Sequence, residues 1–230
     1  MRSTGRRTRF SMDGRTLRGK RIREQIKAQI IAAHTDLMRE GIPLPTTVEV
    51  ARRAGLSLRV LFKHFHDANS LRKAVIQQLL TESQRMMAQP IDYSLPLGAR
   101  FLAFVERHTR MLEAMTPFRR AGCVLEYSMP LVAASLRRAR RDTIGAIAEV
   151  VTPEIYRLLP AKRKELIAAL HTVCCWPSWE NLRVVHRFSQ AAARQVMAQS
   201  AMALLREAFA ARSTELALGS SLAPADPNRQ

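Results

Sequence analysis

The 230-residue chain is poor in acidic and aromatic residues and lacks the motifs of most enzymes. Its three cysteines have no C-x-x-C spacing, which suits a reducing compartment better than a disulfide scaffold. The six histidines form no H-x-x-x-H pair, so no zinc site is predicted. No G-x-S-x-G, P-loop or G-x-G-x-x-G motif occurs, and no apolar run is long enough to span a membrane. We therefore predict no enzyme, no cofactor and no membrane partner.

The adjacent cysteines, Cys174 and Cys175, leave two interpretations open. They could sense redox state or a soft metal, or they could simply fill space within a helix. Packing is the simpler interpretation, because nothing else nearby has the spacing of a metal site.

Positive charge dominates the chain, with 37 Lys+Arg against 19 Asp+Glu, a net charge of +18 and a pI near 11.3. Such an excess favours a polyanionic partner, first nucleic acid and second an anionic membrane surface. Residues 1–27 alone hold ten basic and two acidic residues. We predict a disordered basic arm over residues 1–20, which could follow DNA phosphates, enter a minor groove, or only solvate the chain. Arginine-rich starts are also typical of organelle transit peptides.

The remaining chain predicts helices only, since apolar residues recur every three or four positions and nowhere alternate as in a strand. The fold class is therefore all-α. We expect a DNA-binding domain over 21–89, a helical effector-binding and dimerisation domain over 90–212, and a flexible tail over 213–230. The expected helices cover 22–41, a segment capped by Asp67 that stops before Pro90, then 96–115, 117–128, 130–151, 161–185 and 189–212.

Two short helices stand out between residues 46 and 65. Thr46 can cap the first, and Glu49 can complete a capping box with it. Gly55 supplies a left-handed residue after this helix, and Ser57 can cap the second. Two helices joined by such a short glycine-containing turn predict a helix-turn-helix.

The second helix carries the predicted chemistry. With Leu61 and Phe65 directed inward, its other face can enter a DNA major groove. Arg59 could donate two hydrogen bonds to a guanine, while Leu58 and Val60 could meet thymine methyl groups. An ordinary helical hairpin with a solvated basic face is the alternative. The predicted DNA-binding set is Thr46, Thr47, Ser57, Leu58, Arg59, Val60, Phe62, Lys63 and His64.

Residues 21–80 resemble the N-terminal domain of the TetR family of bacterial transcriptional regulators. The likeness lies in Thr46, "EVA" (49–51), "AGLS" (54–57) and "LFKHF" (61–65). It implies a homodimer that binds double-stranded DNA at a palindromic operator, represses transcription in the cytoplasm at the nucleoid, and is released by a small-molecule effector. The sequence departs from the family at three places: Phe62 replaces a tyrosine, His66 a proline and Ala68 a lysine.

"SWENLR" (178–183) and "FSQAAARQVM" (188–197) resemble the last two helices of the family, which usually form the dimer interface. We expect a four-helix seam there. Its predicted members are Trp179, Leu182, Ala191, Ala192, Val196, Met197, Ala198, Ser200, Ala201, Leu204 and Leu205.

An apolar and slightly polar set in the second domain suits an effector cavity, although the same residues would also suit a plain helical core. The predicted ligand-binding residues are Phe101, Phe104, His108, Met111, Phe118 and Tyr127. Two other functions stay open. One is a basic architectural DNA-binding protein without an effector, and the other is an enzyme or carrier with an incidental helix-turn-helix.

Overall fold

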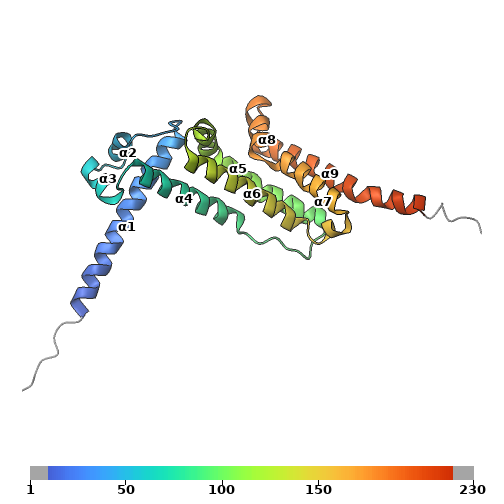
Figure 1. Ribbon diagram of the computed structural model, residues 1–230, viewed down its shortest axis with the longest axis horizontal. Coiled ribbons are helices and arrows are strands. Elements are labelled where there is room, and N and C mark those ends of the chain that lie inside the picture. The colour runs from blue at the N-terminus through green and yellow to red at the C-terminus, as the bar shows by residue number, and fades with distance from the viewer. Residues whose placement is uncertain (1–9, 220–230) are drawn as a thin grey trace, which may run out of the picture. The chain divides into compact units, whose positions relative to one another are not determined.

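The computed structural model describes the backbone of residues 10–219 and the side chains of residues 17–210. Within these residues the fold is all-α, as predicted, and contains no strand (Figure 1). The elements are α1 (Phe10–Arg39), α2 (Thr47–Arg53), α3 (Leu58–His64), α4 (Ala68–Met87), α5 (Leu97–Leu125), α6 (Pro130–Val150), the 3-10 turn η1 (Glu154–Arg157), α7 (Pro160–Cys174), α8 (Trp176–Glu180), the π-helical turn η2 (Asn181–Val185) and α9 (Gln190–Gly219).

The chain divides into two compact units. The first contains the residues up to Thr81 together with Pro117–Ala133, and the second contains Glu82–Thr116 and the residues from Ala134 onward. This division differs from the predicted boundary near Gln89 in two ways. It falls within α4, and it joins the end of α5 and the start of α6 to the first unit. Helices this long can contribute to two cores. The predicted boundary coincides instead with the non-helical segment 88–96 between α4 and α5.

Helix α1 starts earlier than predicted. Its backbone is helical from Phe10, so residues 10–20 are not the disordered arm that their composition suggested, whereas residues 1–9 lie outside the described residues. Adding residues to an existing helix avoids the costly nucleation step, and no proline interrupts this stretch. Ile22, the first residue of the expected helix 22–41, is apolar and yet 47% exposed. The core contacts of α1 begin only at its half-buried Ile26.

The core of the first unit is built from apolar side chains of α1 to α4. Each of these helices buries one face, with residues spaced three or four apart, which is the pattern of a helix packed on one side. The predicted inward positions of Leu61 and Phe65 are confirmed. The buried members are Ile30, Ala33, Leu37, Val50, Ala51, Ala54, Leu61, Phe65, Leu71 and Val75. Asp67 precedes α4 as predicted, and its carboxylate accepts a hydrogen bond from the Ser70 backbone N–H at 2.6 Å.

Two prolines act differently from expectation. Pro117 was expected to separate two helices, but α5 continues through it. Pro177 does interrupt: the predicted helix 161–185 ends at Cys174, and Cys175 is extended before α8 begins. Proline fits the first turn of a helix, where its missing N–H costs nothing, and that is where Pro177 lies.

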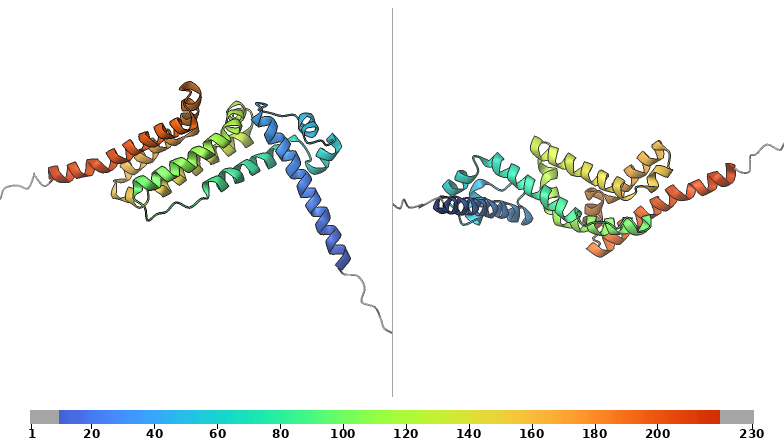
Figure 2. Two further views of the ribbon diagram at one scale, coloured as in Figure 1. Left: turned by 180° about the vertical axis from the view of Figure 1, so that it is seen from behind. Right: turned by 90° about the horizontal axis from the view of Figure 1, so that it is seen from below.

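The second unit has its own core, in which α7 and α9 pack side by side (Figure 2). Buried Leu170 and Cys174 of α7 contribute to it, as does Ala201 of α9. Arg100 is also buried, and its guanidinium donates to the Glu154 carboxylate at 2.5 Å and to the carbonyl of Val150. This pairing neutralises a charge that would otherwise be costly to bury.

The last helix extends to Gly219, beyond the predicted end at Arg212, and residues 220–230 lie outside the described residues. One face of α9 is buried within its own chain. Ala193, Met197, Ala201 and Leu205 recur every four residues along that face. Three residues predicted for a dimer seam on α9 (Met197, Ala201 and Leu205) therefore belong to the core of the protomer, and so does Trp179 of α8. The small side chain of Ala201 correctly predicted close packing, but residue size does not show whether the packing partner belongs to the same chain or to a second copy.

No helix within residues 10–219 is both long enough and apolar enough to cross a membrane. Among the residues with described side chains, no group of histidine, cysteine, aspartate or glutamate could hold a metal ion.

Candidate nucleic-acid interface

Helix α2 begins with the capping box that its sequence predicted. The Glu49 backbone N–H donates to the Thr46 hydroxyl at 3.2 Å, and the Thr46 backbone N–H donates to the Glu49 carboxylate at 2.8 Å. These bonds lower the pKa of Glu49. Two backbone donors that the helix cannot satisfy itself are thereby paired, so the start of α2 is fixed.

The turn between α2 and α3 depends on Gly55, whose φ of +65° lies in the left-handed region. The backbone N–H of Leu56 then donates to the Ala51 carbonyl at 2.9 Å, closing the helix end. From α1, the Gln29 side-chain amide donates to the Ala54 carbonyl at 2.7 Å. Ser57 caps α3 by accepting from the Val60 backbone N–H at 3.3 Å. Sequence reasoning identified these turn residues but missed Gln29, which has no local signal.

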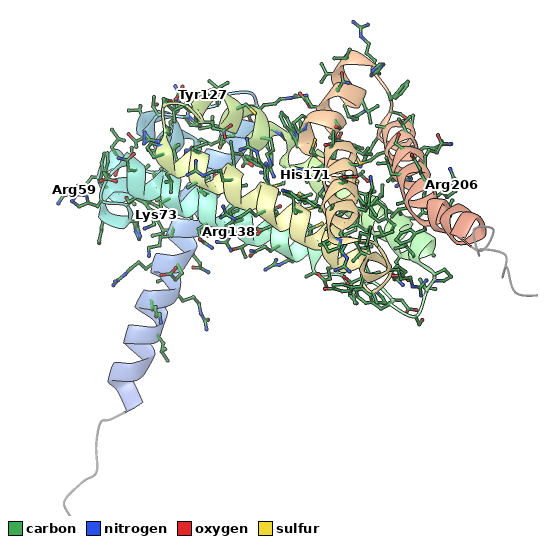
Figure 3. The ribbon with its side chains drawn as sticks, turned by 45° about the vertical axis from the view of Figure 1, so that its right-hand side comes forward. Arg59, Lys73, Tyr127, Arg138, His171 and Arg206 are labelled. Atoms are coloured by element: carbon green, nitrogen blue, oxygen red, sulfur yellow. The ribbon has the colours of Figure 1, made fainter. Side chains whose placement is uncertain are left out.

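Helix α3 presents the outward face that was predicted. Leu61 and Phe65 are buried, whereas Leu58 is 39% exposed and Phe62 is 45% exposed. Arg59 and Lys63 are exposed as well, and Arg59 points away from the first unit into solvent (Figure 3). Val60 is half-buried at the flank. An arginine and exposed apolar side chains thus share one short helix whose other face is fixed in a core.

The remaining predicted DNA-binding residues lie at the edges of this face. Thr46 and Ser57 are exposed, but their hydroxyl groups are engaged as caps, and Thr47 is half-buried. His64 is half-buried too. Burial and the nearby charges of Lys63, Lys27 and Arg23 lower its pKa, with Glu24 acting in the opposite direction. A lowered pKa favours the neutral ring, which can still donate a hydrogen bond to a phosphate.

The predicted effector residues do not all come together. Phe101, Phe104, His108 and Met111 are buried in the second unit. The rings of Phe104 and His108 stack with their centroids 5.0 Å apart. His108 also lies 2.8 Å from the carbonyl oxygen of Cys174, to which its Nε2–H can donate.

The two other predicted effector residues lie elsewhere. Phe118 belongs to the first unit, where the Arg39 guanidinium lies 5.3 Å from its ring centroid. Tyr127 is in the turn after α5 and is 98% exposed, so it cannot line an interior site (Figure 3). Its aromatic ring suggested burial, but the chain leaves the helix at Leu125 and carries Tyr127 into solvent.

A polar network in the second unit was not predicted. The Trp179 indole N–H donates to the Glu113 carboxylate at 2.9 Å, and Arg183 donates to the same carboxylate at 2.8 Å. These contacts raise the pKa of Arg183. Nearby, the Trp176 indole N–H donates to the Thr116 hydroxyl at 3.1 Å. The residues are far apart in sequence, so only the fold brings them together.

The described residues thus form an all-α protein with a helix-turn-helix unit and a separate helical unit. Solved structures with this arrangement include a TetR-family transcriptional regulator from Streptomyces coelicolor, at 20% identity and a TM-score of 0.65, over 85% of this chain and 86% of that one. A transcriptional regulator of the TetR/AcrR family from Thermobifida fusca matches at 22% identity and a TM-score of 0.53, over 78% and 96% of the two chains. A transcriptional regulator from Rhodococcus sp. Rha1 matches at 13% identity and a TM-score of 0.63, over 79% of this chain and 96% of that one.

No protein-family model and no curated protein sequence matches the chain. The structural likeness extends over both units, and it confirms the resemblance noted from the helix-turn-helix residues at the level of fold. The chain has the fold of the TetR-family transcriptional regulators.

Proposed function

We propose that this protein is a transcriptional regulator that binds a palindromic DNA operator as a homodimer, represses transcription, and is released by a small-molecule effector. It would act on the nucleoid in the cytoplasm. The observation that carries the proposal is the outward face of α3, on which Leu58, Arg59, Phe62 and Lys63 are exposed while Leu61 and Phe65 anchor the helix.

The chemistry of that face supports base reading. A helix of this length can enter the major groove with its first turn against the bases. Arg59 has the planar pair of donors that matches the two acceptors of guanine, and Leu58 can contact a thymine methyl group. Lys63, one turn further along, suits a phosphate, which positions the helix without reading sequence.

The dimer would form through the outward side of α9 together with α8. Val196, Ser200 and Ala203 lie along one stripe of α9 next to the buried stripe, and they are partly or fully exposed in the protomer. Leu182, just after α8, is half-buried. Two copies are needed because one helix-turn-helix contacts too few base pairs for useful specificity.

The effector would bind in the second unit, beside Phe101, Phe104, His108 and Met111. Thr116 and Glu113 follow these residues on α5, and their polar groups could orient a small molecule bound near Met111, at the end of this set. Both tryptophans of the chain donate to these two residues, so tryptophan fluorescence would report binding directly.

Selection of duplexes from a random library by the purified full-length protein tests the proposal. We expect an inverted repeat whose half-sites are separated by a whole number of helical turns. Because an architectural binder would neither prefer a sequence nor respond to an effector, recovery of random sequences would favour that alternative. No retention of DNA at low salt would refute DNA binding altogether.

A further inference from the structure

The N-terminal part of α1 is a helix that packs on nothing within the described residues of its own unit. Residues 17–25 are exposed without exception, and burial of α1 begins only at Ile26. Figure 1 shows the N-terminal end of α1 extending away from α2, α3 and α4. Residues 20–24 consist of three basic residues, one acidic residue and Ile22, and Arg18 precedes them. Apart from the exposed Leu17 and Ile22 the segment is mostly polar or charged, and it gains no stability from a core. Its role must therefore be sought in what binds it.

The basic side chains of this segment are arranged on two faces. Lys20, Arg23 and Lys27 follow one another at intervals of three and four residues, so they share one face of the helix. Arg18 and Arg21 are three residues apart and lie on a different face, roughly opposite Lys20. The segment therefore offers two sets of charges that can be compared on one helix.

Helices α1 and α3 pack on one another, and two members of the first face lie near the end of α3. Lys27 and Arg23 both act electrostatically on His64, the last residue of α3, and they add to burial in lowering its pKa. His64 immediately follows Lys63, which is exposed on the proposed DNA-binding face. Positive charge thus continues from α3 onto α1 with no acidic side chain except Glu24, which lies 3.6 Å from Lys27.

We propose that the α1 extension binds the phosphate backbone of duplex DNA beside the groove that α3 occupies, through Lys20 and Arg23. This inference rests on the proposed function, because it takes α3 as the element in the major groove. A helix with exposed cations fits phosphates, whose spacing along a duplex is regular and independent of sequence. The protected DNA at each half-site then extends beyond the base pairs read by α3.

The contact has a specific physical signature. Each phosphate that a cation neutralises releases condensed counterions, and the slope of log K against log salt concentration changes by about 0.9 per phosphate. Because the homodimer carries two copies of each residue, replacing Lys20 and Arg23 by glutamine removes four phosphate contacts from the complex. This should reduce the steepness of that slope by about 3.6 and weaken binding at every sequence alike. Base preference should stay unchanged, because phosphate contacts carry no sequence information.

The experiment compares full-length K20Q/R23Q with its matched control R18Q/R21Q, which removes the same charge from the other face. All four side chains are exposed, so both variants should fold, and circular dichroism checks this. We expect the slope to change for K20Q/R23Q and to change by less than half as much for the control. Hydroxyl-radical footprinting should lose its outermost protected phosphates in K20Q/R23Q only.

Equal effects of the two variants would overturn the inference, since they would reflect net charge rather than a facing contact. An unchanged slope for K20Q/R23Q would overturn it as well. Either result leaves sequence-specific binding by the wild type intact, whereas a wild type that selects no sequence would instead contradict the proposed function.

Discussion

Acidification should destabilise the helix-turn-helix unit through a single buried histidine. His34 lies on α1 within the core of the first unit and is only 4% exposed. Among the described residues, neither of its ring nitrogens has a hydrogen-bond partner. Burial, with a smaller effect from the nearby Arg72 charge, lowers the pKa of His34 from 6.5 to about 4. The neutral ring is therefore part of the folded state.

The direction of the effect follows from proton binding. Between pH 6.5 and about 4 the unfolded chain carries a proton on His34 that the folded chain does not, so the free energy of unfolding falls as pH falls. Linkage gives a loss of about 2 kcal/mol at about pH 5 and about 3 kcal/mol once both states are protonated. The full stability is present above about pH 6.5.

Hydrogen exchange of the full-length protein, measured by mass spectrometry on peptides from α1 and α3, isolates this unit from the rest of the chain. His34→Leu is the matched variant, because it keeps an apolar side chain of similar volume and cannot be protonated. We expect the variant to lose most of the pH dependence between pH 7.5 and 5. The carboxylates of Glu40 and Asp67 have lowered pKa values and titrate below this window. His64 also has a lowered pKa, but it is present in both proteins, so its contribution is common to the two curves. Parallel curves for the wild type and His34→Leu would refute the reasoning.

Three further outcomes follow from the packing. Gly55→Ala should destabilise the first unit by about 1–2 kcal/mol, because Gly55 is left-handed, and denaturant melting that gives no loss would contradict this. Burial raises the pKa of Cys174 to about 12, so this thiol should be inert in the folded protein. Thiol labelling followed by mass spectrometry should modify the exposed Cys123 quickly and Cys174 only on unfolding, and equal labelling rates would contradict this. Ala201→Arg should unfold the second unit, because Ala201 is fully buried, whereas Ala203→Arg, at an exposed position, should give a folded monomer. Sedimentation with circular dichroism decides, and a dimeric Ala203→Arg places the interface elsewhere.

The sequence predicted most of the first unit because its signals are local. The capping box of Thr46 and Glu49, the left-handed Gly55 and the alternation of buried and exposed residues on α3 each depend on a few neighbouring residues. Local signals cannot show which distant side chains meet. Gln29 and the Glu113 network therefore escaped prediction.

Errors arose where composition was used in place of geometry. An arginine-rich segment suggested disorder, yet residues 10–20 continue a helix that is already formed. The aromatic ring of Tyr127 suggested an interior site, and small Ala201 suggested an interface between chains. Tyr127 is 98% exposed in a turn, and Ala201 is buried within its own protomer. Both positions depend on where long helices end and on which neighbour covers each face.

The central claim is that α3 reads bases in the major groove through Arg59, and substitution of single guanines in the selected operator by 7-deazaguanine tests it most directly. This base lacks the N7 acceptor that one arm of an arginine would use. We predict one guanine per half-site at which the substitution weakens the wild type but not Arg59→Ala, together with a loss of about 1–3 kcal/mol for Arg59→Ala on the unmodified operator. If every substitution affects both proteins equally, and Arg59→Ala weakens all sequences alike, Arg59 holds a phosphate and the claim is wrong.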